Sequence, residues 1–223
     1  MSAPEPNPFR WSKTLVAGGR GFIGRMLVSR LEALGAIVMT IGLRPSEEKG
    51  GRRHLRVDLR DPATLRAVLA PNPPHYVFNL GGYIDHAAFR HGGHEVLDTH
   101  FAGTANLLDA IDWDCLRAFV QVGSSDEYGS MPAPQREDMR EAPISPYAAA
   151  KTAATHLIQA LARTENFPGV VARLFLVYGP GQDQERFLPQ LIAGCLRDME
   201  IPVSHGEQYR DFCYIDDVVD VLL

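Results

Sequence analysis

Three absences narrow the possible functions of this sequence. Its 223 residues include only three cysteines, Cys115, Cys195 and Cys213, and no two of them have a C-x-x-C spacing. Their small number and their spacing predict reduced thiols in a cytoplasmic protein, and they argue against a disulfide framework or a zinc site made of cysteines. No apolar run reaches 18 residues, which excludes a membrane-spanning helix in this sequence. The net charge of −5 argues against nucleic acid or a membrane surface as a partner.

The first residues, MSAPEPNPFRW, lack the charged and then apolar order of a signal peptide. We expect residues 1–12 to form a flexible tail.

From residue 13 onward, predicted strands and helices alternate. The strands are nearly continuous apolar runs, which is typical of parallel strands buried on both faces. The pattern predicts an α/β fold, in which helices cover both faces of a doubly wound parallel sheet. The polar segment 42–53 is predicted to be a solvated loop. The predicted strands are 14–18, 36–42, 54–59, 75–82, 116–125 and 169–179, and the predicted helices are 22–34, 62–70, 95–111 and 146–163.

Three evenly spaced glycines follow the first predicted strand, in KTLVAGGRGFIG. In a strand–turn–helix unit, the first (Gly18) permits a tight turn and the second (Gly21) lets the backbone approach a pyrophosphate. The third (Gly24) lets helix and strand pack closely. Free N–H groups at the start of the helix favour phosphate. This context predicts a dinucleotide site; the alternative is a glycine-rich turn without a function.

The end of the second predicted strand indicates which dinucleotide is bound. An NAD site has an acidic residue there for the ribose 2′-hydroxyl, whereas an NADP site uses a basic residue for the 2′-phosphate. Here Gly42 occupies the acidic position, and Arg20 and Arg44 lie nearby in the sequence. We therefore expect both arginines to bind the 2′-phosphate, so that NADP(H) is favoured over NAD(H); solvated arginines are the alternative. Asp58 is expected to accept a hydrogen bond from the adenine amino group.

The segment SPYAAAK, residues 145–151, suggests acid–base chemistry. Tyr147 and Lys151 are four residues apart and share one face of a helix. Ser145 is a suitable N-cap and Pro146 suits the first helical position. An ammonium group beside a phenol favours the phenolate and lowers its pKa. The preceding segment GSSDEYG, residues 123–129, supplies a serine hydroxyl for the same substrate oxygen.

Together these motifs resemble the extended short-chain dehydrogenase/reductase family, the group of nucleotide-sugar epimerases, dehydratases and reductases. The resemblance rests on AGGRGFIG, VDLRD, FNLGG, GTANLLDA, GSSDEYG, YAAAK, RLFLVYGPGQ and RDFCYIDDVVD, in this order. It implies a Rossmann-type fold, a nucleotide-sugar substrate and a cytoplasmic homodimer. Residues 13–175 would form the NAD(P)-binding domain. Residues 176–223 would begin a small C-terminal substrate-binding domain, of which this chain would hold a part.

The resemblance also assigns residues to roles. Ser124 takes the catalytic Ser/Thr position, Tyr147 becomes the acid/base, and Lys151 lowers the pKa of that tyrosine and holds the nicotinamide ribose. The substrate residues would be Ser125, Asp126 and, for the diphosphate, Arg210. The remaining cofactor contacts would come from the matching motifs, at Phe22, Ile23, Leu59, Leu80 and Gly81.

Three positions depart from the family pattern. Leu176 and His100 each replace a common asparagine, and Asn79 replaces a frequent histidine. These changes concern substrate contacts and leave the fold prediction intact. The histidines of HAAFRHGGH have irregular spacing and lack a fourth ligand, so we expect a solvated loop and no metal site.

The expected reaction is reduction of a nucleotide-linked 4-keto-6-deoxyhexose with NADPH. A 4,6-dehydratase needs two acidic residues after the Ser/Thr, and an ungapped alignment places Ser125 and Asp126 there. A shift by one residue would instead align Ser125, Asp126 and Glu127 with the Thr-Asp-Glu of the dehydratases, so dehydratase and 4-epimerase remain alternatives. A non-catalytic NADP-binding sensor or scaffold is a further alternative, although such proteins typically lose the tyrosine or the lysine.

Overall fold

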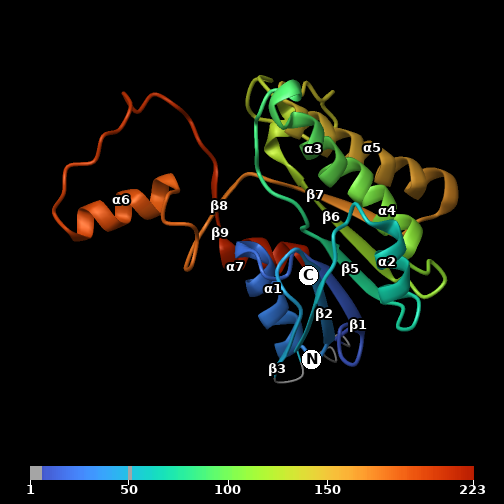
Figure 1. Ribbon diagram of the computed structural model, residues 1–223. Helices are drawn as coiled ribbons and strands as arrows, with labels where there is room; N and C mark the ends of the chain where they lie inside the picture. The colour runs from blue at the N-terminus through green and yellow to red at the C-terminus, as the bar shows by residue number, and fades with distance from the viewer. Residues whose placement is uncertain (1–6, 50–51) are drawn as a thin grey trace, which may run out of the picture.

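The computed structural model describes residues 7–49 and 52–223, which form a seven-stranded sheet with helices on both faces (Figure 1). The strand order is β3-β4-β2-β1-β5-β6-β7, and every neighbouring pair is parallel except β3 with β4. The predicted doubly wound α/β fold is thereby confirmed. The strands are β1 (Lys13–Ala17), β2 (Ile37–Gly42), β3 (Glu47–Lys49), β4 (Arg52–Arg56), β5 (Tyr76–Asn79), β6 (Ala118–Ser124) and β7 (Gly169–Leu174).

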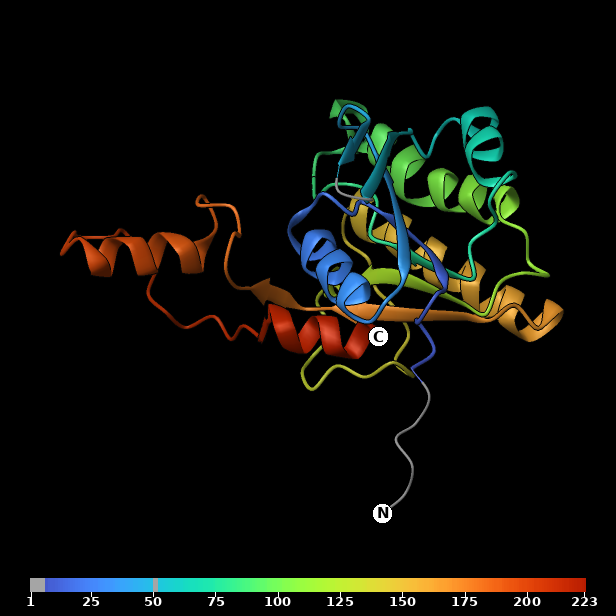
Figure 2. The same cartoon turned by 90° about the horizontal axis from the view of Figure 1, so that it is seen from below.

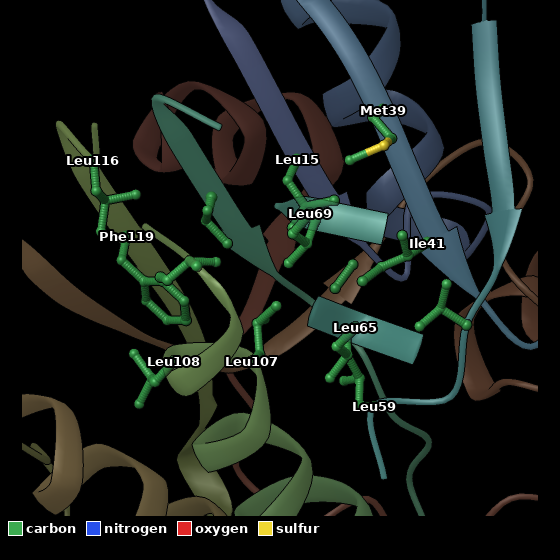
Figure 3. Close-up of a cluster of buried hydrophobic side chains, with 14 of the residues drawn as sticks. Leu15, Met39, Ile41, Leu59, Leu65, Leu69, Leu107, Leu108, Leu116 and Phe119 are labelled. Carbon is green, nitrogen blue, oxygen red and sulfur yellow. The ribbon is translucent and has the colours of Figure 1, made fainter. Parts of the chain in front are cut away.

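Two helical layers cover this sheet. On one face lie α1 (Phe22–Ala33) and α7 (Ile215–Leu222), and on the other lie α2 (Pro62–Leu69), α3 (Gly93–Leu97), α4 (Gly103–Ala110) and α5 (Pro146–Glu165) (Figures 1 and 2). Each layer buries its own apolar cluster against the strands, because parallel strands present apolar side chains to both faces. The larger cluster joins the strands to α2, α4 and α5 (Figure 3), and its fully buried members include Leu15, Leu65, Leu69, Leu107 and Phe119.

A second, two-stranded sheet begins where the main sheet ends. The predicted single strand 169–179 is two strands, because β7 pairs with β6 whereas β8 (Leu176–Tyr178) pairs with β9 (Phe212–Tyr214). Between β8 and β9, α6 (Phe187–Leu196) and the loop after it extend away from the main sheet (Figures 1 and 2).

The C-terminal helix α7 then returns to the main sheet. Its buried residues Ile215, Val218, Val219 and Leu222 share an apolar cluster with α1. Residues 215–222, predicted to belong to the substrate-binding region, therefore pack with the dinucleotide-binding fold.

Two polar segments differ from the sequence predictions. Residues 7–12, expected in a flexible tail, are packed against the domain: Phe9 is buried, and the Asn7 side chain donates a hydrogen bond to the Leu34 carbonyl (2.7 Å). Residues 1–6 of that predicted tail lie outside the described residues. The predicted loop 42–53 contains β3, which pairs antiparallel with β4. Residues 7–12 gain their structure from contacts with distant residues, and β3 gains its structure from pairing with the next strand. In both segments these contacts outweigh the polar local composition.

The predicted helix 95–111 contains a π-helical turn, η2 (Asp98–Ala102), between α3 and α4. Such turns are rare and occur frequently at functional sites. Here the turn holds His100, whose side chain is buried.

The start of α5 matters most for the site. Ser145 is its N-cap, and its hydroxyl accepts a hydrogen bond from the backbone N–H of Ala148 (3.1 Å). Pro146 occupies the first helical position, where no intrahelical hydrogen bond is lost. This cap fixes the start of the helix, and Tyr147 and Lys151 are buried in its first two turns.

We predict that Ser145→Ala lowers the free energy of unfolding by about 1 kcal/mol, because the N–H of Ala148 loses its acceptor. Ser145→Asp, which keeps an acceptor at the cap, is the matched control and should retain most of the stability. Urea unfolding followed by circular dichroism measures both variants. Equal losses in the two variants would show that the cap contributes nothing.

Candidate active site

The glycine loop holds the start of α1 against β1. Gly18 has a φ of +76°, and a Cβ added there would lie 2.6 Å from the Leu80 carbonyl oxygen. A Cβ on Gly24 would lie 2.2 Å from the Gly18 carbonyl oxygen. Larger residues are therefore excluded at both positions, and Gly21 becomes the N-cap of α1. The N–H groups of the first helical turn lack intrahelical partners and favour a phosphate.

Beside this loop lies a cleft of about 590 Å³ at the carboxyl ends of the strands. Ligands of open α/β sheets bind at this edge. The cleft fits a dinucleotide, because the glycines of its wall let a ligand approach the backbone and Arg20, Arg44 and Arg60 line it. Of the predicted cofactor residues, those lining the cleft are Gly18, Arg20, Gly21, Arg44, Asp58, Leu59, Leu80 and Gly81.

The other predicted cofactor residues have different positions. Phe22 and Ile23 lie in the first turn of α1 and pack against the apolar cluster of that face, and Gly24 faces the loop backbone. Tyr147 and Lys151 lie outside the cleft, in a neighbouring cluster described below.

Gly42 lines the cleft together with Arg20 and Arg44. A Cβ at Gly42 would meet its nearest neighbour, Cε1 of His54, at 3.7 Å, an ordinary contact distance. The position thus has room for a side chain. Steric hindrance therefore does not explain why this sequence has glycine there instead of an acidic residue. The Arg20 guanidinium reaches the Pro45 carbonyl (3.4 Å).

Asp58 is bonded to an arginine that the sequence analysis missed. Arg60 donates from Nη2 to Asp58 Oδ2 (2.6 Å) and from Nε to Oδ1 (3.0 Å). This hydrogen-bonded partner lowers the pKa of Asp58. The carboxylate predicted to bind adenine is therefore already paired with an arginine within the cleft. In the sequence, the two-residue spacing of Asp58 and Arg60 in VDLRD could have indicated this pair.

Ser124, Tyr147 and Lys151 come together at the end of β6. The Tyr147 phenol is hydrogen-bonded to the Ser124 side chain and is 5% exposed. Lys151 Nζ lies 5.8 Å from the centre of the Tyr147 ring and donates to the Val122 carbonyl (2.9 Å). Burial lowers the pKa of Lys151 to about 8.

The expected lowering of the Tyr147 pKa is not found in this arrangement. Burial raises the pKa of Tyr147, and the hydrogen bond with Ser124 opposes that rise. Lys151 donates a hydrogen bond to the Val122 carbonyl, and burial disfavours its charged form. The spacing of the two residues indicates the charge of the ammonium group but not the free-energy cost of burying the pair.

Two histidines missed by the sequence analysis adjoin Tyr147. His86 packs edge-on against its ring (5.4 Å between centroids), and His86 Nε2 bonds to Asp126 Oδ2 (2.8 Å). His100 packs edge-on at 5.1 Å and bonds to the Tyr83 carbonyl (2.8 Å). Burial lowers the pKa of His100 to about 4, so this imidazole is neutral at neutral pH. The sequence analysis had placed His86 in a solvated loop. His100 could have been recognised as unusual, because it replaces an asparagine that is common in the family.

The structure decides which serine belongs to the cluster. Ser124 is the residue bonded to Tyr147. Ser125 begins the short helix η3 (Ser125–Tyr128), and Asp126 lies beside Ser124, which accepts a hydrogen bond from its backbone N–H (3.2 Å). Glu127 is fully buried and bonded to Arg173, so it does not face a substrate. This arrangement favours the ungapped alignment over the alignment shifted by one residue.

Arg210, predicted to bind the substrate diphosphate, lies exposed before β9 and donates to the carbonyl of the adjacent Tyr209 (2.9 Å). Arg186, at the start of α6, is the arginine whose charge acts on Tyr147. Asn79 is buried and donates to Thr104 and Gln121, a structural role.

Two further properties concern the described part of the chain. Between residues 7 and 223, leaving out 50 and 51, no group of three or more His, Cys, Asp or Glu side chains is placed to hold a metal ion. Among the helices of the same residues, none has the length and apolar character needed to span a bilayer.

Comparison with known proteins identifies the family. The model of the NAD dependent epimerase/dehydratase family matches residues 14–223. The chain belongs to this family. The resemblance seen in the sequence is thereby confirmed, including the Rossmann-like fold and a family of nucleotide-sugar enzymes that is NAD-dependent by description.

Among curated relatives, the probable dTDP-glucose 4,6-dehydratase of Sinorhizobium fredii is 30% identical over 231 residues, covering 92% of this chain and 65% of the relative. The dTDP-glucose 4,6-dehydratase of Neisseria gonorrhoeae is 30% identical over 229 residues, covering 91% and 66%. The chain thus spans just under two thirds of the length of these relatives.

Among solved structures, MoeE5 in complex with UDP-glucuronic acid and NAD is 32% identical, with a TM-score of 0.80, covering 94% of this chain and 70% of that one. UDP-glucuronic acid 4-epimerase from Bacillus cereus, also in complex with UDP-glucuronic acid and NAD, is 27% identical, with a TM-score of 0.78, covering 93% and 70%.

The buried Lys151 predicts a characteristic pH dependence of stability. Its pKa is about 8 in the folded protein and about 10.4 in an unfolded chain. Between these values the unfolded chain binds more protons, so stability rises with pH, by at most about 1.4 kcal/mol per pH unit. Lys151→Met should therefore stabilise the protein more at pH 7 than at pH 10. Urea unfolding at both pH values measures this, with Arg163→Met at the exposed end of α5 as the control. If Lys151→Met changes the free energy of unfolding by the same amount at both pH values, the predicted pH dependence is contradicted.

Proposed function

We propose that this protein is an NAD(P)-dependent enzyme that oxidises a nucleotide-activated hexose transiently and eliminates water from it, as a 4,6-dehydratase does. The observation that carries the proposal is the acid–base pair His86–Asp126 beside the Ser124–Tyr147–Lys151 cluster. The curated relatives named above are 4,6-dehydratases, which supports this reaction over the reductase expected from the sequence. The reductase becomes the second candidate.

The cluster at Tyr147 is suited to exchanging a proton with a sugar hydroxyl. The dinucleotide, when bound, accepts a hydride from the sugar and returns it. The Tyr147 oxygen takes the proton of the reacting hydroxyl, and Ser124 donates a hydrogen bond to the oxygen on which charge develops. The Lys151 ammonium lies 5.8 Å from the centre of the same ring.

Elimination of water needs a second acid–base pair, which epimerisation and reduction do not. A base removes the proton at C5, and an acid protonates the departing C6 hydroxyl. Asp126 and His86 provide one carboxylate and one imidazole joined by a hydrogen bond of 2.8 Å, both half-exposed and next to Tyr147. The acid that the sequence lacks at Ser125 is thus replaced by His86 from the loop after β5. Asp126 would take the C5 proton and protonated His86 would give one to the C6 hydroxyl, so that water leaves. When hydride returns to C6, Asp126 would give its proton back to C5, and His86 would be reprotonated from solvent.

NADP(H) is the cofactor form that the cleft favours. Arg20 and Arg44 line it near Gly42, and a carboxylate that would repel a 2′-phosphate is absent from that position. The related structures named above contain NAD, so the preference for NADP(H) is a property proposed for this sequence. This preference is also the observation that favours the reductase as second candidate, because a reductase draws hydride from a reduced pool.

A homodimer and a cytoplasmic location remain predictions from the sequence.

For the cofactor, we predict that replacing Arg20 and Arg44 together by alanine weakens NADP(H) binding by about ten- to hundredfold, because charged hydrogen bonds to the phosphate are lost. NAD(H) binding should change little. Gly42→Asp should shift the preference towards NAD(H), since the position has room for the carboxylate. Isothermal titration calorimetry measures both cofactors, with a double alanine variant at Arg117 and Arg163, outside the cleft, as control. Tighter binding of NAD(H) to the unmodified protein would refute the proposed preference.

For the reaction, we predict that full-length protein converts a nucleotide-linked hexose into its 4-keto-6-deoxy form, with deuterium from D₂O entering C5 and no net NADPH consumed. Asp126→Asn and His86→Gln should lower kcat by about a hundredfold or more, because each removes one proton-transfer group. His94→Gln is the matched control, since His94 pairs with Asp98 in a similarly exposed position. A panel of nucleotide hexoses, followed by mass spectrometry, NMR and NADPH absorbance, provides the measurement.

Each other outcome of this assay selects another function. Consumption of one NADPH per 4-keto sugar supports the reductase. Inversion at C4 without deuterium at C5 supports the epimerase. Binding of cofactor without any turnover, unchanged by Tyr147→Phe, supports a sensor or scaffold, whereas an enzyme should lose its activity in that variant and keep cofactor binding.

A further inference from the structure

A carboxylate that is shielded from solvent lies behind the catalytic cluster. Glu127 is fully buried, and its two oxygens accept three hydrogen bonds of 2.8 Å each. Oε1 accepts from the backbone N–H of Ser124, and Oε2 accepts from the hydroxyl of Thr155 and from Arg173 Nε. A buried charge of this kind is costly unless it is paired and fully bonded.

The partner arginine is itself enclosed. The Arg173 side chain is 6% exposed, and its guanidinium lies 4.9 Å from the centre of the Tyr128 ring. Its Nη2 bonds to Glu141, which in turn pairs with His156 on α5. Arg173 therefore serves two carboxylates, of which Glu127 contacts the catalytic turn and Glu141 does not.

The position of Glu127 links three elements at one point. Ser124 ends β6, Thr155 lies one helical turn after Lys151 on α5, and Arg173 belongs to β7. The space above Glu127 is closed, because a Cβ on Gly123 would lie 2.5 Å from its Oε1. The carboxylate thus holds the Ser124 backbone at a fixed place relative to the helix that carries Tyr147 and Lys151.

The charge of Glu127 acts on the same groups. It raises the pKa of Lys151, in opposition to the burial that lowers it to about 8. It also raises the pKa of Tyr147, as does Asp126, after the larger effect of burial. The other charged groups that face the cluster are Arg173 from β7 and Arg186 from the start of α6.

We infer that Glu127 and Arg173 form a positioning pair, which orients Ser124 towards Tyr147 and places a negative charge behind Lys151. Neither residue touches the substrate. The inference rests on the proposed function for the identity of the reacting groups, but its structural consequence for Lys151 exists without any turnover. A pair with a purely structural role would contribute stability and leave the ionisation of Lys151 and the rate per active site unchanged.

The test compares Glu127→Gln with Glu141→Gln, because each removes one carboxylate from Arg173 and only the first removes the partner of Ser124. The whole sequence contains three lysines, Lys13, Lys49 and Lys151, so ¹⁵N-lysine labelling and NMR titration follow Lys151 directly. The signal of Lys151 is assigned with Lys151→Met. Steady-state kinetics with the nucleotide hexose are measured on the same samples.

In Glu127→Gln we expect the pKa of Lys151 to fall below its value in the unmodified protein, and kcat to fall about ten- to hundredfold with KM little changed, because misplacing a catalytic group has costs of this size. Glu141→Gln should retain both properties. Equal Lys151 titrations and equal kcat values in the two variants would overturn the inference.

If Glu127→Gln does not fold, Glu127→Asp takes its place. This variant keeps the charge and shortens the reach to Ser124, so kcat should fall while the pKa of Lys151 stays near that of the unmodified protein. An unchanged kcat would again overturn the inference. If no nucleotide hexose is converted even by the unmodified protein, the proposed function fails, and the Lys151 titration of Glu127→Gln against Glu141→Gln still decides the positioning role.

Discussion

The close contact between Gly24 and the Gly18 carbonyl is the constraint on which the cofactor side of this structure depends. It lets α1 start directly above the end of β1, so that the N-terminus of the helix and the ends of β2 and β4 border one cleft. A parallel sheet then places the end of β6 along the same edge, next to that cleft. The catalytic cluster lies there because sheet topology, rather than sequence proximity, brings its parts together.

Local patterns in the sequence were sufficient to predict much of this arrangement. Apolar strands and periodic helices predicted the α/β fold, since parallel strands are buried on both faces. The spacing of Tyr147 and Lys151 and the cap at Ser145 are properties of one helix, and the structure has them as predicted. The resemblance to the family supplied Ser124, which the structure places at Tyr147.

What the sequence could not provide depends on distant pairs and on burial. His86 and Asp126 are 40 residues apart, and Glu127 and Arg173 are 46 apart, so no local pattern joins them. The pKa of Tyr147 is raised rather than lowered, because desolvation outweighs the hydrogen bond with Ser124. Residues 7–12 were missed because they gain their structure from partners elsewhere in the chain. β3 was missed because its polar residues pair with the next strand, β4.

The π-helical turn at 98–102 has a consequence for how this chain tolerates insertions and deletions. A π turn holds one residue more than an α turn, so the helix before it and the helix after it are out of register with a single continuous α-helix. Deleting one residue from the turn would straighten the helix and rotate either His100 away from Tyr147 or Leu107 and Leu108 away from the core. The length of this segment is therefore fixed by two surfaces at once.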